Sequence, residues 1–519
     1  MAELSLKQIT DKLNEGFAGS TRKLIFWYDA NAEFNEDVDS LELENADVLR
    51  CEKDNQFYIK HFLEVVDKET NYLVYAPFPK PGIRENHLAD TIAYSKEFFA
   101  DRSSLIAADL GIDDKLMPVI QKYGKFFVSK ERTHKLYDLG LSYNDRSTIE
   151  IALMSVLCKN KTASFEDIVR IVLTDDGFED NKYLSEFEKY GLLNPFWSYV
   201  ESTFGYNDAS PTLEKLTYTL FVSYIARKNS SAIPHAWTNY CAQSKSNNII
   251  AFIDNMMNSV LYGAEFDKLS DITYRSLDCE NQFSKMSVED YADLYLFKGI
   301  DEQVIKWMIA RLENEDVNAK VLDKNIAEIA VARRKKHFGD AFKSEYMVLE
   351  NAFHLISDCK YQYVSGIRDV AKKYMSDAYE INTRYRYFYY YYDQLEDTVP
   401  FERLRELVEN IYTNDYLNAI TVNWNNEFQE TYDTGLKKQI DFFNDYVAKS
   451  KDKTVVIISD ALRYEVAHTL FDKLQQDEKC TRSIDAVQSV LPSYTPLGMA
   501  ALLPHTSIQY TDDYKVMVN

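Results

Sequence analysis

Amphipathic helical periodicity runs through this 519-residue sequence from about residue 85 to about residue 445 and constrains its fold more than any other feature. Apolar residues recur near the 3.6-residue period in one segment after another, and short polar turns separate the segments. The pattern is clearest in DDKLMPVIQKYGKFF, STIEIALMSVLC, FEDIVRIVL, EKLTYTLFVSYIARK, DEQVIKWMIARLENE and NIAEIAVARRKKHFG. The sequence therefore predicts a large all-helical region, which we assign to residues 101–447.

Strand and helix patterns alternate before this region. A helix is expected within residues 1–20, and three strands follow with a helical stretch between the second and third: LIFWYD (24–29), ADVLRCE (46–52) and NYLVYAPF (71–78). Such alternation favours a small α/β unit with a parallel sheet over residues 21–100. Asp29 ends the first strand, where open α/β sheets gather ligands. A ligand-binding role and a turn or cap role for this acid both stay open.

Composition argues against several functional classes. The net charge of −23 makes the whole molecule repel polyanions, so direct nucleic-acid binding is not expected. No segment approaches the roughly 20 apolar residues of a membrane span, and the N-terminus does not resemble a signal peptide, which predicts a soluble cytoplasmic protein. Six widely spaced cysteines without a CxxC pair argue against a zinc ribbon and a disulfide framework, and are expected to be free thiols: Cys51, Cys158, Cys241, Cys279, Cys359 and Cys480.

Two segments of the helical region mix basic residues with other signals. INTRYRYFYYYYDQLED (381–397) places arginines among tyrosines, which can stack on bases or pack between neighbouring helices. ARRKKHFGD (332–340) holds four consecutive basic residues, which suit either a solvated helix end or a phosphate-binding patch. The acidic composition favours helix packing for the first segment and a solvated helix end for the second.

The pattern returns to α/β after the polar run KSKDK (449–453). TVVIIS is a continuous apolar run of the kind that an interior parallel strand needs, which places Asp460 at the carboxyl end of a strand. The helix that follows is expected to bury one face, formed by Leu462, Val466, Ala467, Leu470, Phe471 and Leu474. Asp460 would then lie at the mouth of a sheet, with Arg463 about one helical turn away.

A second unusual stretch, LPSYTPLGMAALLPH, spans residues 491–505. Thr495 followed by Pro496 is typical of a helix start, with a hydroxyl N-cap and proline at the first helical position. A hydroxyl at a helix N-terminus also lies where backbone N–H groups and the helix dipole favour an anion such as phosphate. Spacing alone leaves both a capping role and a catalytic role open for Thr495.

Taken together, an apolar strand ending in Asp, the hexapeptide DALRYE (460–465) and LPSYTPLGMAALLP resemble the PglZ family, a branch of the alkaline-phosphatase superfamily found in BREX phage-resistance systems. RKLIFWYDANAEF (22–34) and IQKYGKFFVSKERTHKLYDL (120–139) resemble the family more weakly. The resemblance covers about a third of the chain. It implies a small N-terminal α/β unit, a long helical middle and the beginning of an alkaline-phosphatase-like α/β domain at 448–519.

The resemblance also assigns roles to residues. It implies that Asp460 is a divalent-metal ligand and that Thr495 is both a metal ligand and the nucleophile, with Ser493 as the alternative nucleophile. Zinc is the most expected metal, with manganese or magnesium as alternatives, since a hard carboxylate oxygen binds all three and the cation activates a hydroxyl. Arg463 would bind phosphate oxygens with its planar fork, or pair with Glu465 instead.

Further Asp and His ligands, which the family pattern places well after the nucleophile, are not recognisable in this sequence. His468 and His505 are too far along their helices to share a metal with Asp460 and are expected to be packing or surface residues. We therefore expect a truncated domain that binds no metal stably and is inactive alone. Two hypotheses remain: a metal-dependent phosphatase or phosphodiesterase, and a non-catalytic helical scaffold for BREX partners, namely a methyltransferase, an ATPase and a small adaptor.

Overall fold

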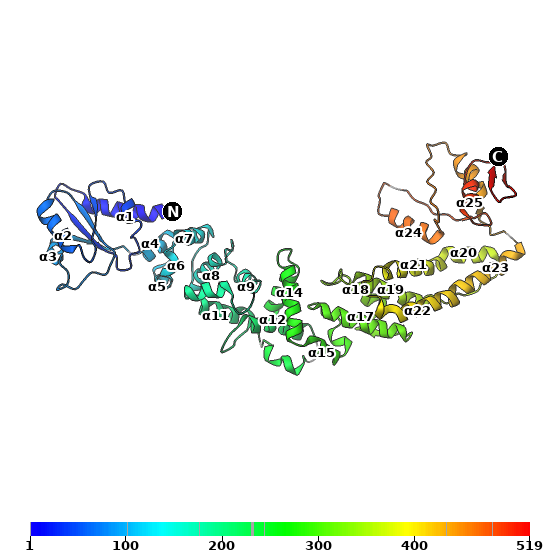
Figure 1. Cartoon of the computed structure of the whole chain (residues 1–519), viewed down its shortest axis with the longest axis horizontal. Coiled ribbons are helices and arrows are strands. Elements are labelled where there is room, and N and C mark those ends of the chain that lie inside the picture. Colours follow the sequence, from blue (N-terminus) through cyan, green and yellow to red (C-terminus); the bar gives the residue numbers. More distant parts are fainter. Residues whose placement is uncertain are drawn as a thin grey trace. The chain divides into compact units, whose positions relative to one another are not determined.

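A computed structural model of the chain describes residues 2–519 apart from residues 101, 176, 230–232, 243, 432 and 480 (Figure 1). The chain forms two compact units, one of Met1–Arg227 with His235–Leu269 and the other of Lys228–Pro234 with Ser270–Asn519. In one unit the α/β segment packs with the first helices, and in the other the C-terminal segment packs with the later helices. No helix among the described residues is both long and apolar enough to cross a membrane.

A four-stranded parallel sheet forms the N-terminal part of the first unit, as predicted. Its strands are β1 (Leu24–Tyr28), β2 (Asp47–Arg50), β3 (Tyr72–Ala76) and β4 (Lys96–Phe98), in the order β2-β3-β1-β4. The edge strand β4 was not predicted, because three residues, two of them charged, give no apolar pattern. Helix α1 (Ala2–Phe17) precedes the sheet, and α2 (Gln56–His61) and α3 (Ala89–Ala93) lie between its strands in sequence.

Both faces of this sheet are covered, which explains the uninterrupted apolar sequence of β1. Phe26 packs with Ile59 of α2 in one apolar core, while Trp27 packs with Leu13 of α1 in the other. All five residues of β1 are buried. Successive side chains of a strand point to opposite faces, so a strand between two helical layers must be apolar at every position.

Asp29 follows β1 and caps a turn. Its side chain is 5% exposed and its Oδ2 accepts hydrogen bonds from the Phe34 N–H at 2.7 Å and from the Tyr75 hydroxyl at 2.5 Å. The turn-and-cap interpretation of this acid is therefore confirmed.

Helices follow one another from the end of the sheet to the C-terminal segment, which confirms the predicted helical region. In chain order they are α4 (Arg102–Asp109), α5 (Met117–Lys122), α6 (Gly124–Phe127), α7 (Lys130–Asp138), α8 (Arg146–Leu157), α9 (Phe165–Leu173), α10 (Lys182–Lys189), α11 (Leu193–Phe204), α12 (Leu213–Lys228), α13 (Ser246–Met257), α14 (Gly263–Ser276), α15 (Cys279–Ser284), α16 (Val288–Tyr291), α17 (Lys298–Glu313), α18 (Ile326–Arg333), α19 (Lys343–Asp358), α20 (Ile367–Lys373), α21 (Tyr379–Tyr392), α22 (Glu402–Ile411) and α23 (Ala419–Thr431). Two-residue strands β5 (Lys320–Val321) and β6 (Lys324–Asn325) interrupt them. Five cysteines are unpaired thiols, and Cys480 lies outside the described residues.

A buried ion pair ties three of these helices together. Arg333, at the end of α18, contacts Asp301 of α17 at 2.6 Å, and the Tyr346 hydroxyl of α19 donates to the same carboxylate at 2.5 Å. All three side chains are at most 2% exposed. The predicted solvated helix end is therefore wrong for Arg333, because this residue forms an ion pair with a buried acid on a neighbouring helix.

The tyrosine-rich helix α21 packs against its neighbours, as the packing interpretation predicted. The hydroxyls of Tyr385 and Tyr389 donate to Glu409 of α22 at 2.7 and 2.5 Å, and the Tyr385 ring stacks on Tyr412 with 3.6 Å between centroids. These contacts account for the aromatic run by helix packing.

The C-terminal segment packs against the later helices with short elements. They are β7 (Lys437–Lys438), α24 (Tyr464–Leu474), β8 (Val487–Gln488), α25 (Thr495–Leu502), β9 (Ile508–Tyr510) and β10 (Val516–Val518). Strand β7 pairs with β8 and β9 pairs with β10, while α24 packs on α21. Helix α25 packs on the helical turn Gln439–Asp441, where the Gln439 amide donates to the Gly498 carbonyl at 3.4 Å.

The structure corrects two expectations for this segment. Val455–Ile458 forms no strand, and Ile457 is 87% exposed, because no other strand of the described chain lies beside this run to pair with it. The face of α24 predicted to be buried is also wrong: Leu470 and Leu474 are exposed, whereas Glu465 is buried against α21 and its neighbours.

Candidate functional site

Asp460, the predicted metal ligand, and Thr495, the predicted nucleophile and metal ligand, lie next to each other in the folded chain. The Thr495 hydroxyl lies 3.4 Å from each oxygen of the Asp460 carboxylate, although 35 residues separate them in sequence. Both side chains are exposed to solvent. An accessible hydroxyl beside an accessible carboxylate is an arrangement suited to chemistry on a bound ligand.

Thr495 does not cap its helix. It is the first residue of α25, with Tyr494 at the N-cap position and Pro496 in the first turn. Its hydroxyl points to Asp460, so the capping interpretation is wrong, and the catalytic role stays a prediction. Ser493, the alternative nucleophile, lies before the helix and is exposed.

A tight turn separates Asp460 from helix α24. Ala461 has a φ of 56°, in the left-handed region that non-glycine residues rarely adopt, and its N–H donates to Asp460 Oδ1 at 3.0 Å. The backbone therefore turns directly after the carboxylate, and Arg463 is the N-cap residue of α24.

Arg463 pairs with Glu465. Its Nε lies 3.0 Å from Glu465 Oε1, and the arginine side chain is 68% exposed whereas the glutamate is 1% exposed. The guanidinium thus reaches solvent at the end of a buried carboxylate. This pairing was one of two predicted alternatives, and the exposure of the arginine side chain leaves phosphate binding, the other alternative, compatible with it.

Both histidines of this segment contact residues other than Asp460. The His468 ring stacks on Tyr379 with 4.4 Å between centroids, and its Nε2 is 3.1 Å from the Tyr379 hydroxyl. His505 Nδ1 lies 2.7 Å from the Leu503 carbonyl. Both are packing or surface residues, as predicted.

Comparison with known proteins connects this geometry to one family. Residues 441–519 match the family described as "PglZ: BREX system PglZ alkaline phosphatase-like domain". The chain is also 33% identical over 538 residues to "Alkaline phosphatase-like protein PglZ" of Bacillus cereus (strain H3081.97), a match that covers 99% of this chain and 62% of that protein. The chain belongs to the PglZ family. A second relative, "Alkaline phosphatase-like protein BrxZ" of Escherichia coli O9:H4 (strain HS), is 26% identical over 520 residues, covering 94% of this chain and 60% of that protein.

This PglZ-family chain spans about six-tenths of the length of the curated relatives that it matches. No solved structure matches it. The family assignment makes the chain a BREX-system protein with an alkaline-phosphatase-like domain at its C-terminal end.

The donor set at Asp460 and Thr495 suits part of a metal site. Two ligand oxygens that are each about 2.1 Å from a tetrahedral zinc ion lie about 3.4 Å apart, which is the separation found here. Among the described residues, however, no group of three or more His, Cys, Asp or Glu side chains could hold a metal ion. The PglZ-family pair therefore fits as two ligands of a sphere that the described residues do not complete.

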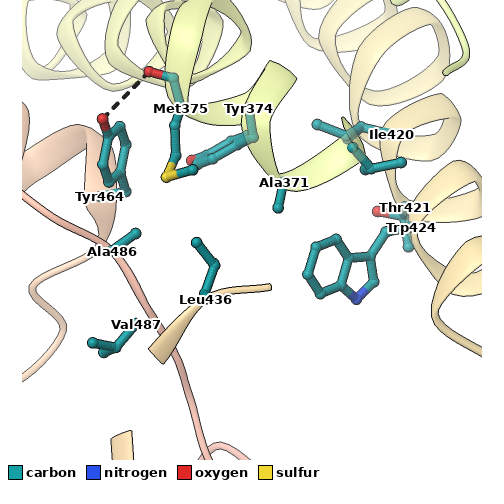
Figure 2. A pocket seen from close by; sticks show the side chains of 11 residues that line it. Ala371, Tyr374, Met375, Ile420, Thr421, Trp424, Leu436, Tyr464, Ala486 and Val487 are labelled. Carbon is teal, nitrogen blue, oxygen red and sulfur yellow. Dashed lines mark hydrogen bonds between the residues drawn. The ribbon is translucent and has the colours of Figure 1, made fainter. Parts of the chain in front are cut away.

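A cavity of about 360 Å³ lies between the later helices and the DALRYE motif (Figure 2). Its walls come from α20 and the turn that follows, from α23 and from the C-terminal segment: Val370, Ala371, Tyr374, Met375, Ile420, Thr421, Trp424, Leu436, Tyr464, Ala486 and Val487. The Tyr464 hydroxyl donates to the Met375 carbonyl at 3.3 Å across its upper edge. Through Tyr464, the DALRYE motif lines this largely apolar cavity together with residues of the helical region.

Sequence reasoning missed the helical residues that support the motif. Tyr374 donates to Glu465 Oε2 at 3.3 Å from 91 residues earlier in the chain, and Gln439 holds the start of the Thr495 helix through Gly498. No pattern in a single sequence marks such distant pairs. The one indication of such partners is Glu465 itself, because a glutamate that is buried needs a hydrogen-bond or charge partner.

Proposed function

We propose that this chain contributes the nucleophile and one metal ligand to a metal-dependent phosphatase or phosphodiesterase site of a BREX phage-defence protein. The observation that carries this proposal is the approach of the Thr495 hydroxyl to both oxygens of Asp460. The family motif supports the same two roles, because it includes both residues.

Each residue then has one task. Asp460 and Thr495 would hold the divalent cation, with zinc favoured over manganese or magnesium, and that cation lowers the pKa of a bound hydroxyl and offsets phosphoryl charge. Thr495 Oγ1 would lose its proton to solvent and attack phosphorus as the bond to the leaving oxygen breaks, while Arg463 binds the phosphoryl oxygens. Water would then cleave the new Thr495–phosphoryl bond and restore the hydroxyl. The remaining ligands would come from the part of the longer relatives that the match does not cover.

Hydrolysis of bis(p-nitrophenyl) phosphate by the full-length protein, with and without added Zn²⁺, tests this proposal. We expect Thr495→Ala to lower kcat/KM at least about a hundred-fold, since removal of a nucleophile leaves only binding and electrostatic contributions. Thr454→Ala is the matched control, because Thr454 is an exposed threonine of the same segment. Unchanged hydrolysis in Thr495→Ala, with Ser493→Ala inactive, would move the nucleophile to Ser493. Unchanged hydrolysis in both would refute the proposal.

A second candidate function is a non-catalytic helical scaffold that docks other BREX proteins in the cytoplasm, namely a methyltransferase, an ATPase and a small adaptor. It is favoured by the succession of helices from α4 to α23, because stacked helices present extended binding surfaces. The Thr495→Ala variant separates the two functions, since docking would survive the loss of the hydroxyl.

A further inference from the structure

The Arg463–Glu465 pair crosses the boundary between solvent and the protein interior. Glu465 Oε1 is buried and forms no well-aligned hydrogen bond among the described residues, so the 3.0 Å contact with Arg463 is an ion pair. A buried carboxylate is costly unless an opposite charge compensates it. The arginine is therefore drawn to this oxygen by a strong electrostatic requirement.

The second oxygen of Glu465 is held from the helical region. The Tyr374 hydroxyl donates to Oε2 at 3.3 Å and accepts from Asn382 Nδ2 at 2.8 Å, and the Tyr412 hydroxyl donates to Asn382 Oδ1 at 2.9 Å. Linked hydrogen bonds polarise one another and fix the orientation of each member. The carboxylate is thus oriented by residues that precede it by more than fifty positions.

Tyr374 remains a donor over the whole physiological pH range. Burial, together with the neighbouring Glu465 carboxylate, raises the pKa of Tyr374 to about 12. A phenol that stays protonated can only donate to an ionised carboxylate, so this bond does not change direction near neutral pH.

The first half of helix α24 is fixed to the same neighbours. Beyond Tyr464 and His468, which contact the helices as described above, the Arg386 guanidinium of α21 donates to Thr469 Oγ1 at 3.0 Å. These contacts at the start and in the middle of the helix fix the position of Arg463, its N-cap residue, relative to the buried carboxylate of Glu465.

We propose that Glu465 is a positioning residue that holds Arg463 by Nε, turns its two terminal amino groups toward a phosphate-type oxyanion, and is itself set in place by Tyr374. The inference rests on the proposed phosphoesterase function. A guanidinium bound along its Nε edge keeps a planar pair of N–H groups for a second, bidentate partner. The helical region would then act on the site through one hydroxyl, which gives it a role beyond docking.

Kinetics of the full-length protein with bis(p-nitrophenyl) phosphate test the positioning role. Glutamine keeps the shape of the glutamate but removes the charge that pairs with Arg463, so Glu465→Gln should raise KM about ten-fold while kcat changes less. Tyr374→Phe should act in the same direction, about three-fold. Glu478→Gln and Tyr390→Phe are the matched controls, because both residues are exposed. Equal effects of the variants and their controls would overturn the inference.

A double-mutant cycle separates positioning from general stabilisation. If Glu465 acts through Arg463, then Glu465→Gln should have no further effect on KM in an Arg463→Ala background. Additive effects would mean that Glu465 influences the site by another route and would overturn the inference.

Chemical modification gives a readout that needs no activity. Phenylglyoxal modifies arginine side chains, and peptide mass spectrometry measures the rate at Arg463. Release from Glu465 exposes the guanidinium further, so Glu465→Gln and, more mildly, Tyr374→Phe should accelerate modification several-fold over their controls. An unchanged rate in both variants would overturn the positioning role. A wild-type protein that hydrolyses no phosphodiester would refute the proposed function, and the modification rates would still decide whether Glu465 holds Arg463.

Discussion

Two apolar runs of this chain end in aspartate, LIFWYD at 24–29 and VVIISD at 455–460, and they fold differently. The first is a buried interior strand, and the Asp29 carboxylate that follows it accepts hydrogen bonds from the Phe34 N–H and the Tyr75 hydroxyl within a turn. The second forms no strand among the described residues, and its Asp460 is exposed beside Thr495. The comparison teaches that an apolar run forms a strand only where neighbours are present. Strand β1 has a strand on each side and a helical layer on each face, whereas Val455–Ile458 pairs with no strand among the residues that the structure describes.

The largest difference should be seen in amide hydrogen exchange of the 519-residue chain. Amides of β1 exchange only when the sheet opens, and we expect protection of at least about 10³-fold there against less than about ten-fold at Val455–Ile458. Exchange resolved by peptide mass spectrometry measures both segments in one sample. Strong protection of the second run would break the comparison, because it would show that the run is paired in solution.

A matched pair of substitutions sharpens the same contrast energetically. Ile25 is 3% exposed in β1 and Ile457 is 87% exposed. We expect Ile25→Ala to lower the free energy of unfolding by about 2–5 kcal/mol, because it removes buried contacts and leaves a cavity. Ile457→Ala should change it by no more than about 0.5 kcal/mol. Urea unfolding followed by tryptophan fluorescence measures the first cost, since Trp27 lies beside Ile25 in β1. An equal cost for Ile457 would place this side chain in a core.

The sequence allowed much of the fold to be predicted where the signal is local. The parallel sheet and the helix succession follow from periodicity, since each strand or helix carries its own apolar pattern. The buried ion pair of Asp301 and Arg333 could not be predicted, because the two residues are 32 positions apart and only packing brings them together. The basic run that contains Arg333 looked like a solvated helix end for the same reason.

The candidate site, too, was predicted in part. Asp460 and Thr495 were identified from motif resemblance, and the folded chain brings them together. The face of α24 was predicted wrongly, because the leucine spacing was taken to point at a core, whereas a buried glutamate, Glu465, faces the helical region. A buried polar residue such as Glu465 cannot be found by a prediction that expects only apolar residues at buried positions.

The last and smallest contrast concerns the two aspartates themselves. Asp29→Ala leaves the Phe34 N–H and the buried Tyr75 hydroxyl without this acceptor, so we expect a loss of about 1–3 kcal/mol in the free energy of unfolding. Asp460→Ala removes an exposed carboxylate and should change stability by no more than about 0.5 kcal/mol. Their effects on phosphodiester hydrolysis by the full-length protein should be reversed, with Asp460→Ala inactive and Asp29→Ala active under conditions where it remains folded. A variant at Asp460 that is destabilised but active would mean that both aspartates are structural. The two runs would then differ in their surroundings, but the aspartate that ends each of them would have the same structural role.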